Sequence, residues 1–183
     1  MKRRLSLLPV VLLLSSFLAL AQWREAGKIV PDTAWSKSDG AFGVTLVFTD
    51  KPDEFFAAWE KPTPGVRLSE TSTATRGLPI VTILYFTGCM ANTAGNCDVV
   101  GRFTTTAPDG KPYGEAFDAK IWVDKPAPEK NMLQLSQDYL GLVIDPGDQL
   151  GKYVVKVEIL DRVSKKKMTL EREFTAVEAP EKQ

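Results

Sequence analysis

The stretch LPIVTILYFTGCMANTAGNCDVVGR, from Leu78 to Arg102, decides the fold of this chain. It contains an apolar segment, a small polar loop between two cysteines, and the start of a second strand-like segment. Its β-branched and aromatic residues suit a pleated, buried surface, and the residues from Gly88 to Gly95 are typical of a turn. We therefore predict two core strands whose ends are joined by a disulfide.

Cys89 and Cys97 are the only two cysteines among the 183 residues. In an exported chain, an oxidising compartment makes a disulfide the default state of such a pair. A redox-active pair usually has the tighter Cys-x-x-Cys spacing and a cationic neighbour, and a zinc site would need more ligands. We predict a structural Cys89–Cys97 bridge, which should contribute about 2 to 3 kcal/mol on the chain-entropy model.

The start of the chain has the organisation of a secretory signal peptide. Residues 2–4 are basic, residues 5–20 are largely apolar, and residues 19–21 (Ala-Leu-Ala) match a signal-peptidase site. The apolar run is too short for a membrane span, and no cysteine near the cleavage site offers a lipid anchor. We predict that residues 1–21 are removed and that the mature chain, without a membrane span, lies in the bacterial periplasm or, alternatively, outside the cell.

The length and charge of the mature chain limit the number of domains and the kinds of partner that it can have. Removal of 21 residues leaves 162 (183 minus 21), a length suited to one domain. The chain has 23 basic and 23 acidic residues, and the signal holds three basic ones, so the mature formal charge is −3 (20 minus 23). The only basic run, residues 165–167, is explained as a solvated hairpin turn. A nucleic-acid surface needs clustered basic residues, so we expect no nucleic-acid partner.

The chain contains no histidine, which excludes several kinds of catalytic and metal site. Ser-His-Asp and Cys-His catalysis and the common zinc sites are excluded. No pattern places two carboxylates across a cleft, as glycoside hydrolysis requires. We expect a non-enzymatic protein with no catalytic residue, no metal and no cofactor. Two acidic clusters lack the ligand spacing of a calcium loop: Asp145, Asp148 and Asp161, and Asp50, Asp53 and Glu54.

Residues 50–61 are the one segment predicted to be helical. Pro52 suits a first turn, the two acidic residues after it complement the helix dipole, and a proline follows the segment. Phe55 and Trp59 lie four residues apart and share a face, which would anchor so short a helix on the sheet. The alternative is that Phe55, Phe56 and Trp59 form an aromatic patch that binds a protein partner.

The rest of the chain predicts β structure. After residue 77, strand-like segments follow at short intervals with turn signals between them, which is typical of an antiparallel β-sandwich. We predict an N-terminal extension (22–76) packed on a main domain (77–178), with a disordered tail (179–183). The extension would hold a strand at 43–49, the helix, a strand at 66–68 and a surface connection at 71–75. The predicted strands of the main domain are 80–87, 98–106, 113–123 with an interruption, 132–135, 140–144, 153–161 and 168–177.

Residues 78–177 resemble an immunoglobulin-like sandwich. The run from Asp148 to Tyr153 (DQLGKY) is similar to the lead-in of a tyrosine corner, and Trp122 would be the buried core tryptophan. Val155 stands where an antibody domain has its second sheet-bridging cysteine, so the resemblance implies an architecture and no binding site. The features TDKPDEFFAAWEKP, FTGC, GNCDV, APDGKPYG and LEREFTAVE also resemble a group of secreted bacterial proteins of unassigned function, which implies no activity.

Together these features predict a mainly β protein, an immunoglobulin-like antiparallel β-sandwich with one short helix in its N-terminal extension. The expected function is that of an exported interaction or accessory module that binds another periplasmic or cell-envelope protein through a strand edge or the helix. The alternative is a small-ligand or carbohydrate-binding protein. Its aromatic platform would be Trp35, Trp59 or Trp122, because a flat aromatic face can stack on a sugar ring.

Overall fold

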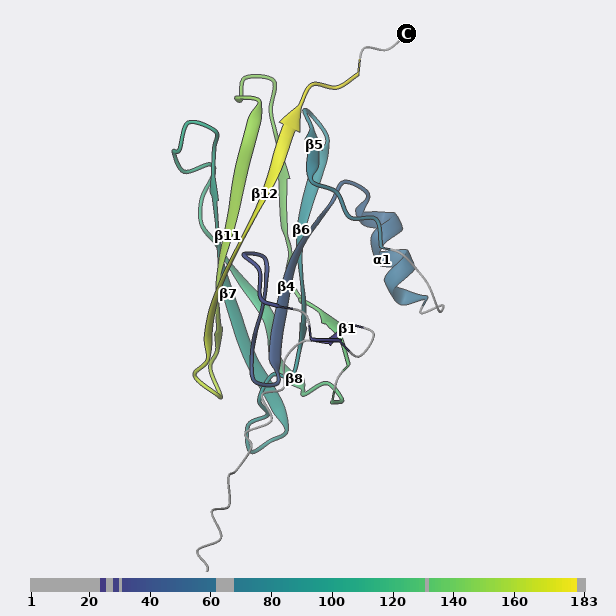
Figure 1. Cartoon of the computed structure of the whole chain (residues 1–183), viewed down its shortest axis with the longest axis vertical. Coiled ribbons are helices and arrows are strands. Elements are labelled where there is room, and N and C mark those ends of the chain that lie inside the picture. Colours follow the sequence, from purple (N-terminus) through teal and green to yellow (C-terminus); the bar gives the residue numbers. More distant parts are fainter. Residues whose placement is uncertain (1–23, 26–27, 30, 62–67, 131, 181–183) are drawn as a thin grey trace, which may run out of the picture.

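The computed structural model describes residues 24–25, 28–29, 31–61, 68–130 and 132–180 (Figure 1). The predicted signal peptide lies outside these residues, as does most of the strand predicted at 66–68. The elements are β1 (Arg24–Glu25), β2 (Lys28–Ile29), β3 (Ser36–Asp39), β4 (Phe42–Thr49), α1 (Pro52–Glu60), β5 (Thr73–Thr75), β6 (Pro79–Thr87), β7 (Asn96–Thr106), β8 (Phe117–Pro126), β9 (Gln134–Leu135), β10 (Leu140–Val143), β11 (Gly151–Asp161) and β12 (Lys167–Val177).

The fold is mainly β and has two five-stranded sheets, in agreement with the predicted class. The β6 sheet has the order β10-β6-β4-β3, with β9 also paired to β6, and the β11 sheet has the order β5-β12-β11-β7-β8. Every pairing is antiparallel except that of β5 with β12. In the described part of the chain, no helix is long and apolar enough to cross a membrane.

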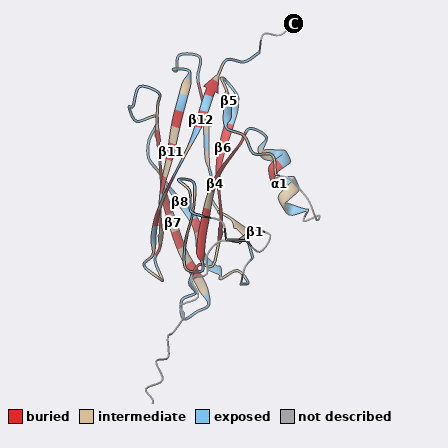
Figure 2. Cartoon of the chain, viewed as in Figure 1, coloured by how far each residue is buried: buried red, intermediate tan, exposed pale blue. Residues whose placement is uncertain are grey.

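The main core lies between the two sheets. Alternate residues of β7, β11 and β12 are buried, so each of these strands has one face in the core (Figure 2). Strand β4 is buried along almost its whole length and contributes to the main core and to a second one. At the start of β11, the Tyr153 hydroxyl donates a 2.7 Å hydrogen bond to the carbonyl oxygen of Gln149. The bond joins a strand tyrosine to the backbone four residues upstream, within the DQLGKY run.

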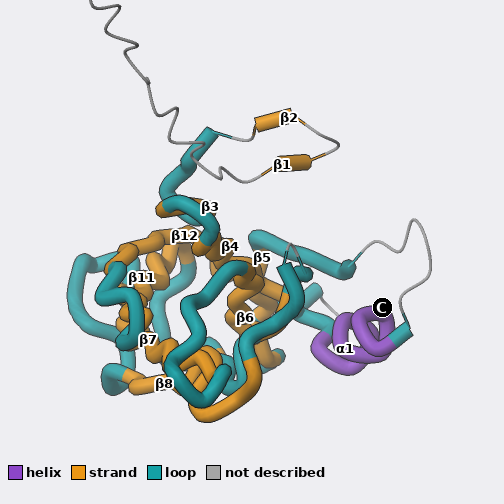
Figure 3. Tube along the Cα trace, turned by 90° about the horizontal axis from the view of Figure 1, so that it is seen from below, coloured by secondary structure: helices purple, strands orange, loops and turns teal. Residues whose placement is uncertain are grey.

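Strand β6 is buried on both faces, which explains its unbroken apolar sequence. One face meets the main core, and the other, with Val81, Ile83 and Tyr85, forms a second core with Val47 and Phe55. Phe55 belongs to α1, so the helix covers the outer face of the β6 sheet (Figure 3). The order of layers is therefore helix, β6 sheet, β11 sheet.

Short segments lie along both open sides between the two sheets. On one side, the backbone N–H groups of Gln137 and Asp138 donate to the carbonyls of Ile121 and Lys120, each at 3.0 Å. These bonds cover part of the edge of β8, so that edge is protected from strand addition. On the other side, the Glu171 N–H donates to the Ala34 carbonyl at 2.8 Å.

Several sequence predictions need correction. Residues 71–75 were expected to be a surface connection, yet Thr73–Thr75 pairs in parallel with β12 and Ala74 is buried. The strand predicted at 113–123 begins only at Phe117, since Gly114 has a positive φ of 69°. Of the strands from the predicted extension, β4 belongs to the β6 sheet and β5 belongs to the β11 sheet.

Trp122 differs from the predicted core tryptophan because it is only partly buried. Its ring packs on Phe86 at 5.4 Å between centroids, at the border of the main core. Its indole N–H donates to the Pro126 carbonyl at 2.9 Å, and the Lys125 ammonium lies 4.6 Å from the ring centroid. Trp122 therefore closes one border of the core rather than filling its centre.

Gly88, which precedes the first cysteine, cannot be replaced without strain. Its φ is +70°, and a Cβ atom there would lie 1.9 Å from the Ala41 carbonyl oxygen. Gly88→Ala should therefore lower the free energy of unfolding by about 3 kcal/mol, measured by urea denaturation. Gly95 is the matched control, because its φ is +84° but nothing lies within 4 Å. Equal losses at the two positions would show that the contact with Ala41 is unimportant.

Candidate functional site

The helix α1 is held on the sheet by two parallel ring stacks. Pro52 lies in its first turn with acidic Asp53 and Glu54, which complement the positive end of the helix dipole. The rings of Phe55 and Trp59 both stack on Tyr85, with centroid distances of 6.1 and 5.8 Å and interplanar angles of 7° and 9°. The anchoring role predicted for Phe55 and Trp59 agrees with this geometry.

Phe55, Phe56 and Trp59 differ in what they offer to a partner. Phe55 is fully buried and presents no surface, whereas Phe56 and Trp59 are partly buried at the border of the second core. Phe56 also lies 5.3 Å from the ring of Tyr139, whose exposed fraction is 49%. We call the surface formed by Phe56, Trp59, Leu133, Leu135 and Tyr139 the helix patch.

Sequence reasoning missed three members of the helix patch. Leu133 and Leu135 were assigned to a strand, and Tyr139 was not singled out. Leu133 and Leu135 pack against the second core because β9 pairs with β6. The residues after β9 cross to β8, and Tyr139 then lies against Phe56. The nearest signal in the sequence is the alternation of leucines in Leu133-Gln134-Leu135, which indicates one apolar face but not what it faces.

The helix patch has an acidic border. The segment 50–61 carries four acidic and two basic residues, and Asp53, Glu54 and Glu60 are exposed. Lys51 forms an ion pair with Glu54 at 3.5 Å. Beneath the patch, burial, followed by the charge of Glu70, raises the pKa of the Tyr85 hydroxyl far above its usual range. Tyr85 therefore stays neutral and acts as a packing residue.

The Cys89–Cys97 disulfide predicted from the sequence is present. Cys89 follows β6 and Cys97 lies in β7, so the bridge joins the two sheets across eight residues of sequence. Both cysteines are buried, and the neighbouring Met90 N–H donates to the Asp161 carboxylate at 3.0 Å. The bridge belongs to the core, and its position is that of a structural cross-link.

Removal of the bridge should weaken the protein without changing its fold. Cys89→Ala with Cys97→Ala should lower stability by about 2 to 3 kcal/mol, because the unfolded chain gains loop entropy. Calorimetry should show a lower Tm, while the strand-rich far-UV spectrum at room temperature is retained. Two free thiols in protein purified from the periplasm would contradict the assignment of a structural bridge.

The acidic clusters do not form a metal site in the described residues, where no three His, Cys, Asp or Glu side chains are placed to hold an ion. Asp145 and Asp148 belong to one turn, in which the Asp145 N–H donates to the Asp148 carboxylate at 2.8 Å. Asp161 lies at the far end of β11 and is buried. Their role in this turn therefore accounts for Asp145 and Asp148.

Because of Asp148, the free energy of unfolding should change with pH in the acid range. A 2.6 Å hydrogen bond from the Tyr113 hydroxyl, followed by the Asp145 N–H, lowers the pKa of its carboxyl below 3.8. A depressed native pKa adds stability above the unfolded value, and that contribution is lost as the pH falls through the native pKa. In Tyr113→Phe, the free energy of unfolding should therefore depend less on pH below about pH 4 than it does in the wild type. Urea titrations at several pH values measure this dependence. An unchanged profile would show that the hydrogen bond is unimportant.

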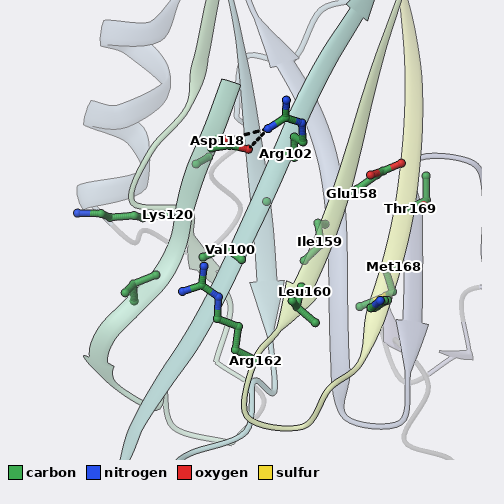
Figure 4. A pocket seen from close by; sticks show the side chains of 14 residues that line it. Val100, Arg102, Asp118, Lys120, Glu158, Ile159, Leu160, Arg162, Met168 and Thr169 are labelled. Carbon is green, nitrogen blue, oxygen red and sulfur yellow. Dashed lines mark hydrogen bonds and ion pairs between the residues drawn. The ribbon is translucent and has the colours of Figure 1, made fainter. Parts of the chain in front are cut away.

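A second surface lies on the outer face of the β11 sheet, which forms an open hollow of about 700 Å3 (Figure 4). The cross-strand pair Val100 and Leu160 forms its floor. Arg102 binds both oxygens of Asp118, at 2.7 and 2.8 Å. Mixed, paired charges around a small apolar floor are typical of the solvated face of an antiparallel sheet.

The three candidate tryptophans of an aromatic platform have different surroundings. Trp59 is stacked on Tyr85, and Trp122 packs on Phe86 beneath Lys125. Trp35 has an exposed fraction of 43% and follows Ala34, whose carbonyl is bonded to β12. Of the three, Trp35 is the one whose ring is most available to a ligand.

Comparisons with known proteins give no family. No family model and no curated protein matches the chain. One similar solved structure is a family 123 glycoside hydrolase from Clostridium perfringens, with 12% identity and a TM-score of 0.42. The match covers 76% of this chain and 28% of that one. Another is an alkylpurine DNA glycosylase from Pseudomonas fluorescens, with 13% identity, a TM-score of 0.36, and 58% and 27% of the two chains covered. Likenesses this weak carry no functional inference.

Proposed function

We propose that this chain is an exported, non-enzymatic interaction module of the bacterial periplasm, or of the extracellular space, built on an immunoglobulin-like sandwich. The signal-like residues 1–21 and the disulfide support export. The tyrosine-corner bond from Tyr153 to Gln149 supports the immunoglobulin-like architecture. The lack of histidine supports a binding role over catalysis.

The observation that carries the proposal is the cluster of partly exposed aromatic rings in the helix patch. Phe56 and Tyr139 lie against each other at the surface, on a base formed by the buried Phe55 and Tyr85. Aromatic residues on a rigid base are typical centres of protein interfaces, because they bury large areas at little cost in conformational entropy. The helix patch is therefore the proposed contact surface.

The acidic border defines the chemistry of the partner. Asp53, Glu54 and Glu60 are exposed on the same helix that supplies Phe56 and Trp59. A complementary surface would present apolar side chains flanked by lysine or arginine, and such charges raise the association rate and select the partner. The proposed partner is another periplasmic or cell-envelope protein with a surface of this kind.

The test uses residues of the patch that do not hold the fold together. A Phe56→Ala, Tyr139→Ala variant leaves Phe55 and Trp59 on Tyr85, so the helix should stay docked. The matched control is Val100→Ala, Leu160→Ala on the opposite face. After cross-linking in the periplasm, affinity capture should recover one envelope protein with wild type and control, and lose it with the patch variant.

Binding of the purified partner should then weaken at high salt, because salt screens the acidic border. Capture of that protein by all three forms would place the contact elsewhere on the chain. Capture by none of them would overturn the proposal of an interaction module.

A further inference from the structure

Trp35 is held in place by its backbone and not by burial of its ring. Its carbonyl accepts the Leu46 N–H at 2.8 Å, and its N–H donates to the Thr33 hydroxyl at 3.3 Å. The carbonyl of the preceding Ala34 accepts the Glu171 N–H at 2.8 Å. The segment is therefore bonded to both sheets, and the half-exposed ring is presented in a defined position.

A hollow of about 410 Å3 lies beside this ring. Trp35 and Ala34 line one part of the hollow, and Val154 of β11 adds an aliphatic side chain. Glu171 and Glu173 of β12 supply two exposed carboxylates. Its volume lies within the range of about 300 to 1,000 Å3 that small-molecule sites occupy. One aromatic face, one aliphatic contact and a few polar groups are also the usual content of such sites.

Arg172 lines the same hollow and supports the ring. Its guanidinium carbon lies 5.8 Å from the Trp35 ring centroid and 5.6 Å from that of the buried Phe48. The guanidinium is also bonded to the Leu46 carbonyl at 2.9 Å and pairs with Glu70 at 3.4 Å. Because these contacts hold Arg172, the indole has a fixed neighbour and forms a rigid, flat surface.

The charges narrow the class of ligand. Two carboxylates repel an anion, and the Arg172 guanidinium close to the indole disfavours a cation over that ring. A neutral ligand is not repelled by either kind of charge. If it carries many hydroxyl groups, the carboxylates can accept strong hydrogen bonds from them. Lys152, which binds Glu173 at 3.0 Å, adds a donor next to the hollow.

We propose that the hollow at Trp35 is a saccharide-binding site. The apolar face of a pyranose ring would stack on the indole, while its hydroxyl groups donate to Glu171 and Glu173. The site is formed by β11, β12 and the segment before β3, whereas the helix patch lies on the outer face of the β6 sheet. The two proposals are therefore independent.

The test is titration of the mature protein with cellotriose, maltotriose and chitotriose. Binding is detected by saturation-transfer NMR at about 10 mM sugar, a concentration that fills sites with dissociation constants near 1 mM. Calorimetry then measures the affinity. We expect at least one of the three to bind. Trp35→Ala should weaken that binding at least about tenfold by removing the stacked ring, whereas Trp35→Phe should retain most of it. Trp122→Phe, on β8 at the other edge of the β11 sheet, is the matched control and should bind like wild type.

Two further measurements decide the assignment. The variants should keep the wild-type Tm to within a few degrees, so that lost binding reports the site and not the fold. Glu173→Gln, which keeps an acceptor oxygen, should retain sugar binding, and the affinity should not change with salt. Failure of all three sugars to bind, or equal binding by Trp35→Ala, would overturn the proposal. Binding of tetramethylammonium in place of the sugars would show a cation site instead.

Discussion

Asp161→Ala is expected to lower the free energy of unfolding by about 3 to 5 kcal/mol. The carboxylate is fully buried and accepts three backbone hydrogen bonds, from Met90 at 3.0 Å, Val163 at 2.9 Å and Ser164 at 3.1 Å. Alanine would leave these donors without partners, and each unsatisfied buried donor costs about 1 to 3 kcal/mol. Urea denaturation measures the loss.

The position of Asp161 explains why so much depends on one side chain. It ends β11, and its bonds join the turn before β12 to the residue that follows Cys89. Hydrogen exchange at the Met90 amide should therefore rise sharply in the variant, even under conditions where the sheets stay folded.

Asp109→Ala is the matched control for Asp161. Asp109 also bonds to a turn backbone, through the Lys111 N–H at 3.0 Å, but its contacts are exposed. Its replacement should change the free energy of unfolding far less than that of Asp161, because solvent screens an exposed contact. A loss below about 1 kcal/mol for Asp161→Ala would show that the buried carboxylate does not hold the disulfide loop.

Phe55→Ala is expected to have an effect of similar size, about 3 to 5 kcal/mol. Phe55 is fully buried, stacks on Tyr85 and packs in the second core with Val47, Val81 and Ile83. Its removal would leave a cavity beneath a helix of nine residues, which is too short to be stable alone. The helix should therefore undock.

The undocking has its own signature. Hydrogen exchange of the α1 amides should rise more than that of β11 in Phe55→Ala. Phe56→Ala, one position along the helix, removes a partly exposed ring and should cost about 1 kcal/mol. Equal losses in the two variants would show that Phe55 is not the anchor.

Local features of the sequence suffice for the individual elements. The segment 50–61 contains α1 (Pro52–Glu60), because a proline, two acidic residues and a following proline mark the ends of a helix. The strands β6, β7, β11 and β12 also lie where apolar patterns and turn residues predict them. The disulfide follows from the two cysteines and their spacing, because no other partner exists.

Local features do not specify which elements meet. The segment Thr73–Thr75 is short and has polar, surface-facing threonines. Its sequence therefore gives no sign that it pairs in parallel with β12, about a hundred residues later. Trp122 is a large apolar residue of the kind that fills a core, yet its position on β8, the edge strand of the β11 sheet, leaves it partly exposed. Both differences come from neighbours that are distant in sequence.

The sequence by itself therefore determined the class of the fold, the helix, most strands and the cross-link, since each depends on residues close together in the chain. Only the tertiary structure decided that the disulfide joins two sheets, that Tyr139 lies against Phe56, and that Trp35 stands beside Glu171. These contacts depend on the order of strands in the sheets, and that order is set by the packing of the whole core.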